Sequence, residues 1–184
     1  MVRLTNIDAD SFELRLKEPN YKNQGHIDEV ISYVVIEVGT WTLSDGTLLA
    51  SGSQNSNTLS SAGLDKVSFA DAFNAPPAVL TQVQTYNGAD WVTTRTDNVT
   101  GQSFDLMMQE EERLNAGSHV AETIGWLATA QGASHDQDTL LEGGVTADVF
   151  TNQANVHSFK GSFDLAPTLL TKLTSFNGSD PAIS

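Results

Sequence analysis

Two stretches of this 184-residue chain, SFELRLKE at residues 11–18 and SFDLMMQE at residues 103–110, read as one strand written twice. In the first stretch apolar and charged side chains alternate, which is the pattern of a half-buried β-strand with one face in water. Phe12 of the first stretch falls on Phe104 of the second, a shift of 92 residues. The sequence therefore contains an internal repeat whose unit is built from strands.

Two further blocks keep the same order. HIDEVISYVVIEVG at 26–39 aligns with HVAETIGWLATAQG at 119–132, and VSFADAFNAPPAVLTQVQTYNG at 67–88 aligns with HSFKGSFDLAPTLLTKLTSFNG at 157–178. The shifts are 93 and 90 residues, so the chain holds two copies of one unit, cut out of phase. Equivalent pairs include Arg3 and Arg95, Asn6 and Asn98, His26 and His119, Glu29 and Glu122, Tyr33 and Trp126, Phe69 and Phe159, Phe73 and Phe163, and Asn87 and Asn177.

The apolar periodicity within the blocks is two, as in strands, and no segment has the pattern of a long amphipathic helix. Asn-Gly pairs at 87–88 and 177–178 follow apolar runs as turn signals, and a Pro-Pro pair precedes another run. The sequence predicts an all-β fold of short antiparallel strands. The strand-like runs lie near 2–7, 11–18, 29–38, 46–53, 64–69, 77–86, 91–99, 102–111, 121–130, 139–146, 156–160 and 167–176.

Composition excludes several classes of function. The chain has 9 Lys and Arg against 23 Asp and Glu, a formal charge of −14, which disfavours nucleic acid and anionic membrane surfaces as partners. It has no cysteine, so a disulfide framework, a thiol nucleophile and a thiolate metal site are excluded. No apolar run is long enough to insert across a membrane, and MVRLTNIDAD lacks the order of a signal peptide.

Residues 48–131 resemble the H-type lectin domain, the six-stranded sandwich of snail agglutinins and of the C-terminal part of discoidins. The matching features are Phe69 ahead of the Pro76-Pro77 pair, Arg95 nine residues ahead of Phe104, and a last strand in which a tryptophan is followed by apolar residues. The resemblance covers one full unit, and the repeat of that unit covers the rest of the chain in two pieces.

The resemblance implies two antiparallel six-stranded β-sandwiches. Residues 47–131 would be one complete sandwich, and residues 1–39 plus 139–180 would supply the second as two half-units. Three strands cannot bury a sandwich face alone, so each half-unit needs a partner. We favour pairing within the chain, where the effective concentration is higher, over completion by a neighbouring chain in a homo-oligomer.

In H-type lectins the sugar lies between subunits of a trimer and is held by an acidic residue, an arginine and an aromatic-histidine pair. These positions fall near Asn57 and Thr58, on Trp91, and on Glu111 and Glu112. None of the residue types that bind sugar in the family is therefore present at these positions. The substitutes still suit a sugar, because tryptophan offers a flat apolar face and carboxylates and amides bond to hydroxyls. The predicted ligand-binding residues are Trp91, Asp90, Asn57, Glu111, Glu112 and Tyr86. The alternative is that Trp91 packs on the rim of the sandwich.

Acidic clusters at 110–112 and 134–138 suggest Ca²⁺ as a weaker alternative to simple solvated charge, since no twelve-residue calcium loop is present. His119 and Glu122 lie three apart on a strand, so they point to opposite faces and cannot share one ligand. We expect the repeated Arg3 and Arg95 to pair with a carboxylate such as Asp97 or Glu122.

The sequence contains no catalytic constellation, and an enzyme is not expected. It favours non-catalytic carbohydrate binding by a lectin-like module of a larger secreted or surface protein, with neutral galactose-type glycans as partners and without a cofactor. The alternative is a structural or interaction repeat of a surface adhesin with no sugar site. An exposed Trp91 beside Glu111 and Asn57 would favour the first function, and a buried or remote Trp91 the second.

Overall fold

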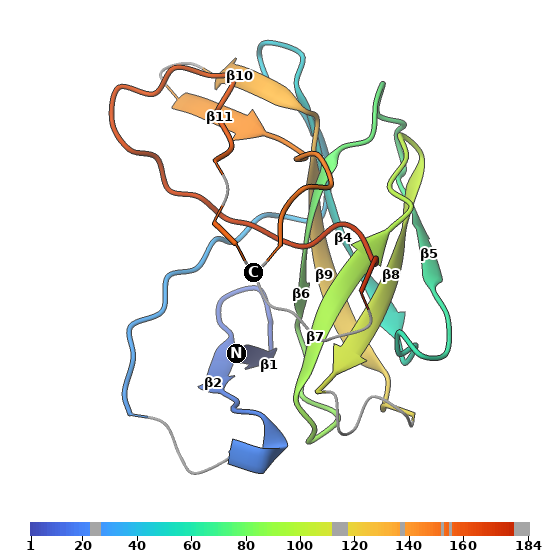
Figure 1. Ribbon diagram of the computed structural model, residues 1–184. Coiled ribbons are helices and arrows are strands. Elements are labelled where there is room, and N and C mark those ends of the chain that lie inside the picture. The colour runs from blue at the N-terminus through green and yellow to red at the C-terminus, as the bar shows by residue number, and fades with distance from the viewer. Residues whose placement is uncertain (23–26, 112–117, 137–138, 152, 155, 179–184) are drawn as a thin grey trace.

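The computed structural model describes residues 1–22, 27–111, 118–136, 139–151, 153–154 and 156–178, and its described residues form an all-β protein, as predicted (Figure 1). The elements are β1 (Val2–Thr5), β2 (Glu13–Leu16), the short 3₁₀ helix η1 (Asn20–Lys22), β3 (Gly39–Thr42), β4 (Leu48–Ser56), β5 (Asp65–Ser68), β6 (Ala78–Val83), β7 (Val92–Asp97), β8 (Ser103–Glu110), β9 (Glu122–Thr129), β10 (Gly132–Asp136) and β11 (Thr139–Gly143). Within this described part, no helix has the length and hydropathy to span a bilayer.

Two antiparallel sheets form a central sandwich. One sheet has the strand order β3-β4-β9-β6 and the other has the order β5-β8-β7. Strands β4 to β9 lie within the stretch predicted as one complete unit, and β3 adds a further strand at the edge beside β4. Strand β9, the last of the unit, lies between β4 and β6, which are contributed by its first half.

Four aromatic rings form the centre of the sandwich core. Phe69 meets Phe73 edge to face at 4.9 Å between ring centroids, and Phe104 meets Trp126 edge to face at 5.8 Å. The two pairs join because Phe69 lies 5.7 Å from Trp126. Each such contact contributes about 0.5–1.5 kcal/mol beyond burial of the rings.

Gly52 on β4 allows Trp126 to pack against the sheet. The two residues are direct partners in the β4–β9 ladder, and a Cβ added at Gly52 would lie 2.6 Å from the indole Cζ2. A side chain at this position is therefore excluded unless the indole moves.

The hairpin β1–β2 repeats the hairpin β7–β8 in register and in its turn. Arg3 is paired with Arg15, and the equivalent Arg95 is paired with Met107. Asn6 and Asn98 both take the left-handed conformation, with φ of 49° and 48°. The repeat seen in the sequence is thus a repeat of backbone structure.

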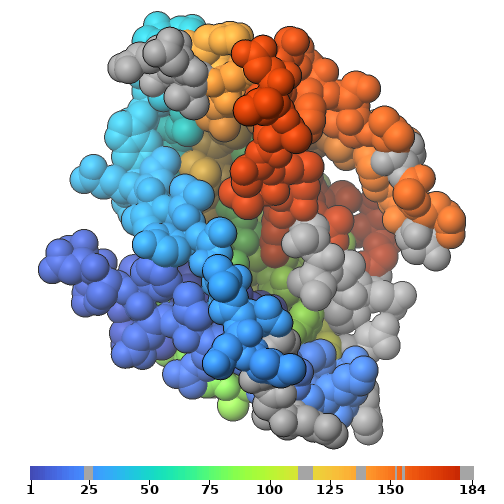
Figure 2. Space-filling model, turned by 90° about the vertical axis from the view of Figure 1, so that its left-hand side faces the viewer, coloured from blue at the N-terminus to red at the C-terminus, as the bar shows by residue number. Residues whose placement is uncertain are grey.

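Among the residues that the structure describes, no strand ladder joins the two half-units. The described residues outside the sandwich contain two separate two-stranded sheets, β1–β2 and β10–β11. The strands predicted near 29–38, 156–160 and 167–176 are wrong for this structure, which assigns no strand to these stretches. A strand requires a ladder partner, and in the complete unit the partners of these stretches come from the opposite half. The assembly of the second sandwich stays a prediction. Figure 2 shows the N-terminal half-unit in blue and the C-terminal half-unit in orange and red on one face of the molecule.

Candidate functional site

Arg3 lies at a buried contact between the N-terminal half-unit and the sandwich, which we call the first junction. Its Nη2 donates to Glu122 Oε1 at 2.7 Å and to the Thr85 carbonyl at 3.0 Å, and its Nη1 donates to the Asp90 carbonyl at 3.1 Å. The side chains of Arg3 and Glu122 are fully buried. The expected pairing of a repeated arginine with Glu122 is confirmed for Arg3.

The carboxylate of Glu122 is held by four groups. Besides Arg3, it accepts hydrogen bonds from the Thr85 hydroxyl, the Asn87 N–H at 3.1 Å and the Gly88 N–H at 2.9 Å. Burial alone would raise the pKa of Glu122, but the hydrogen bonds from Thr85, Gly88 and Asn87, together with the charge of Arg3, lower it below its ordinary value. Glu122 is therefore a charged group at the centre of the first junction.

Tyr86 and Asp90, both predicted to bind sugar, contact the N-terminal half-unit. The Tyr86 ring lies under two guanidinium groups, 4.9 Å from Arg3 and 4.5 Å from Arg15. The Asp90 carboxylate accepts a hydrogen bond from Asn20 Nδ2 at 2.6 Å. The Tyr86 ring and the Asp90 carboxylate therefore belong to the first junction.

Trp91 and Glu111 are buried. Trp91 is 5% exposed, and Glu111 Oε2 accepts a hydrogen bond from the Asn20 N–H at 2.7 Å. Asn57 is exposed in the loop after β4, and no hydrogen bond among the described residues joins it to Trp91 or Glu111. Glu112 lies outside the described residues. The buried Trp91 is the outcome that the structural-repeat alternative predicts.

The acidic clusters do not assemble a metal centre in the part of the chain that the structure describes, where no group of three or more His, Asp or Glu side chains is placed to hold an ion. In the cluster at 134–138, the His135 N–H donates to Asp45 Oδ2 at 2.9 Å. At the strand end near 110, His119 Nε2 lies 3.8 Å from Glu110 Oε1, and burial raises the pKa of Glu110.

A second junction links the sandwich to the C-terminal half-unit. Arg95 Nη2 donates to the Ser175 carbonyl at 2.8 Å, and its guanidinium lies 5.2 Å from the centre of the Phe176 ring. Its Nη1 donates to Gln109 Oε1 at 3.0 Å. Beside it, Lys172 Nζ donates to the Thr93 hydroxyl at 3.3 Å.

The two junctions are equivalent under the repeat. The shift of 92 takes Arg3 to Arg95, and the shift of 90 takes Thr85 and Tyr86 to Ser175 and Phe176. Each arginine thus donates to a backbone carbonyl at the equivalent position in the unit that follows it in the chain. Each also lies over the aromatic ring of the next residue in that unit. Such a contact is head-to-tail, because it uses different surfaces of the two units. The sequence did not predict that the carbonyls of Thr85 and Ser175 accept from the arginines, or that Asn20 contacts the sandwich. The repeat did show the paired arginine and aromatic positions.

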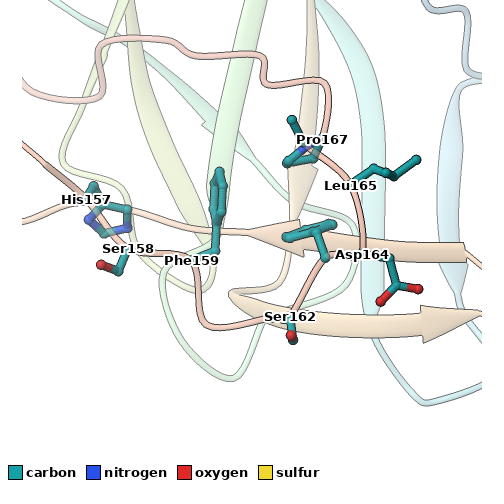
Figure 3. Close-up of a pocket in the computed structure, with 10 residues that line it drawn as sticks. His157, Ser158, Phe159, Ser162, Asp164, Leu165 and Pro167 are labelled. Carbon is teal, nitrogen blue, oxygen red and sulfur yellow. The ribbon is translucent and has the colours of Figure 1, made fainter.

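The C-terminal half-unit has an open hollow of about 540 Å³, shown in Figure 3. Phe159, Leu165 and Pro167 line it, while the Ser162 hydroxyl and the Asp164 carboxylate point away from Pro167. His157, Ser158 and other polar residues line it as well, so it is an open surface hollow of mixed polar and apolar character.

No family model matches the chain. Over 150 residues, which are 80% of the chain, it is 33% identical to Halomucin of Haloquadratum walsbyi. The chain spans about 2% of the length of that relative.

Proposed function

We propose that this chain is a structural repeat module of a large protein of the cell surface, in which β-sandwich units are bonded head to tail through buried arginine junctions. The observation that carries the proposal is that Trp91 and Glu111, two residues predicted to bind sugar, are buried, and that Asn20 of the preceding unit bonds to Glu111. At the same junction, Arg3 of the preceding unit pairs with the buried Glu122. The module has no catalytic role.

The similarity to a short stretch of a far longer relative supports a place in an array, and the mucin-type name of that relative supports a place at the cell surface. The charge of −14 supports the same setting, since a high net charge of one sign keeps a large protein soluble and prevents non-specific contacts.

Glycan binding and stability measurements test this function together. We expect a glycan array to show no binding, with or without Ca²⁺. We expect Trp91→Ala to destabilise the fold by about 3–5 kcal/mol, as for a large ring removed from a core. Asn57→Ala, at an exposed loop position, is the control and should leave stability unchanged. Glycan binding by the native chain that is lost in a folded Trp91→Ala variant would overturn the proposal.

Carbohydrate binding, of neutral galactose-type sugars, is a second candidate with one observation in its favour. Asn20, Asp90 and Glu111 gather amide and carboxylate groups from two units, which is the kind of place where the resembling lectins bind sugar, and Asn20 Oδ1 is buried without a hydrogen-bond partner. Calorimetry with galactose and N-acetylgalactosamine tests it. Binding that is lost in Asn20→Ala would support this candidate, and no heat of binding in the native chain would remove it.

A further inference from the structure

The complete sandwich shows what each half-unit lacks. In the sandwich, β9 is the central strand between β4 and β6, and its residues Ile124 and Ala128 are buried in the core. The equivalent of β9 is the stretch 29–36, which belongs to the N-terminal half-unit. The equivalents of β4 and β6 belong to the C-terminal half-unit.

The C-terminal half-unit has the two flanking strands without the central one. TLLEGG at 139–144, which includes β11, aligns with TLLASG at 47–52, and residues 168–173 align with β6. Leu169 is 64% exposed, whereas Val79, its equivalent in the sandwich, is 1% exposed. A core position is therefore open to solvent in this half-unit.

The N-terminal half-unit has the central strand without its neighbours. The apolar side chains of Tyr33 and Val35 are exposed, whereas Ala128, the equivalent of Val35, is buried. Tyr33 stands where Trp126 stands in the sandwich, and Trp126 packs on Gly52. The equivalent of Gly52 is Gly144, beside which an added Cβ would meet no atom within 4 Å.

Each half-unit already holds half of the four-ring cluster of the sandwich. Phe12 and Tyr33 meet edge to face at 4.9 Å and 71°, like Phe104 and Trp126 at 5.8 Å and 72°. Phe159 and Phe163 likewise meet edge to face, at 5.3 Å and 70°. A hollow of about 710 Å³ that is lined by these two phenylalanines, Leu140 and Leu169 lies open where the other ring pair would pack.

The charges show the same complementarity. Arg3 at the first junction has the carboxylate of Glu122, but within the described residues Arg95 at the second junction has no carboxylate within ion-pair distance. Burial lowers the pKa of Arg95, and the charge of Asp97 opposes this shift without cancelling it. Glu29 is the equivalent of Glu122 and lies at the start of the same stretch, 29–36.

We propose that two copies of this chain complete each other, with residues 29–36 of one copy inserted as the central strand between β11 and residues 168–173 of the other. Tyr33 then packs on Gly144, the two ring pairs join, and Glu29 reaches Arg95. The proposal deepens the proposed function, on which it rests, by naming the partner surface as the half-unit of a second copy. It is strand addition, in which backbone bonds hold the strand and alternate side chains set its register.

A second copy is the favoured donor because both half-units are already fastened to their own sandwich. The Glu37 carbonyl accepts a hydrogen bond from Ser51 at 2.6 Å, immediately before β3 joins β4. The C-terminal half-unit is fastened through Ser175 and Lys172. With these contacts in place, no strand ladder joins residues 29–36 to β11 or to residues 168–173 in the part of the chain that the structure describes, whereas a second copy is free to orient its strand.

Cysteine cross-linking of the 184-residue chain tests the proposal, because the chain has no cysteine of its own. Gly52 and Trp126 are direct ladder partners, so Gly144 and Tyr33 should be partners too, at about 4.5–5.5 Å between Cα atoms, within disulfide reach. We expect Tyr33→Cys mixed with Gly144→Cys under mild oxidation to give a covalent dimer on a non-reducing gel. Tyr33→Cys mixed with Leu165→Cys should give none, because Ala75, the equivalent of Leu165, is exposed in the sandwich.

The double variant with both cysteines in one chain separates the alternatives. A covalent dimer from the mixed single variants supports the proposal. A cross-link that forms only within the monomeric double variant overturns it in favour of closure within one chain, and no cross-link in either sample overturns it as well.

Two exposed leucines supply a matched measurement without oxidation. Leu169 corresponds to a core position, whereas Leu165, which is 84% exposed, corresponds to a surface position. We expect Leu169→Ser to weaken self-association at least tenfold by light scattering, and Leu165→Ser to leave it unchanged. Equal effects would overturn the proposal. Glycan binding would count against the proposed function and leave the cross-link intact, so the two failures are distinguishable.

Discussion

Arg3 and Glu122 lie 119 residues apart in the chain and form an ion pair of 2.7 Å in which both side chains are fully buried. The pair fastens the first hairpin to the last strand of the sandwich. Removing one partner leaves the other charge buried without compensation, which costs more than the pair itself contributes.

Arg3→Met should therefore lower the free energy of unfolding by about 3–5 kcal/mol. Arg15 provides the control, since it contacts the same Tyr86 ring but is exposed. Arg15→Met should change stability by less than about 1 kcal/mol. Urea unfolding of both variants gives the comparison, and equal losses would show that Arg3 acts only through the ring.

The lowered pKa of Glu122 makes the free energy of unfolding depend on pH in the acidic range. The folded chain binds this proton less readily than the unfolded chain, so the contribution of Glu122 is complete above the ordinary glutamate pKa of 4.5 and is lost as the pH falls through the lower folded value. The melting temperature of the native chain should fall across this window. In Glu122→Gln the midpoint should be lower at neutral pH and should depend less on pH. An unchanged acid dependence in this variant would assign the effect to other carboxylates.

Lys172 should make the free energy of unfolding depend on pH in the alkaline range. Burial, reinforced by the charge of Arg95, lowers the pKa of Lys172 from 10.5 to about 8. The unfolded chain binds more protons between these values, so the free energy of unfolding should rise from about pH 8 to about pH 10.5. Lys172→Met should remove this rise and stabilise the chain at pH 7. The control is Lys66→Met, at an exposed position, which should keep the rise.

Gly52 and Gly144 should respond differently to the same substitution. Gly52→Ala places its Cβ against the Trp126 indole and should cost about 1–3 kcal/mol, the usual range for overpacking. Gly144→Ala meets open space and should leave the thermal unfolding of the dilute chain unchanged. A destabilised Gly144→Ala monomer would show that the C-terminal half-unit is already closed in solution.

The exposure expected for Trp91 shows where prediction from sequence failed, because the side chain is buried. Trp91 follows a turn, which made exposure a reasonable expectation, but the N-terminal half-unit lies over the neighbouring residues Asp90 and Glu111 through Asn20. Asn20 is about 70 residues or more from these carboxylates in the chain, and no local pattern reports such a contact.

The repeat, the all-β class and the six strands between 46 and 130 followed from the sequence, because alternation of apolar residues and turn signals are local properties that a strand carries wherever it folds. The strands of the half-units did not follow, because a strand exists only when its ladder partner is in place, and for residues 29–36 the equivalent partners lie near the other end of the chain. Only the tertiary structure revealed that Arg3 and Arg95 make the same contact with the unit that follows each of them, since this contact depends on the packing of one unit against the next.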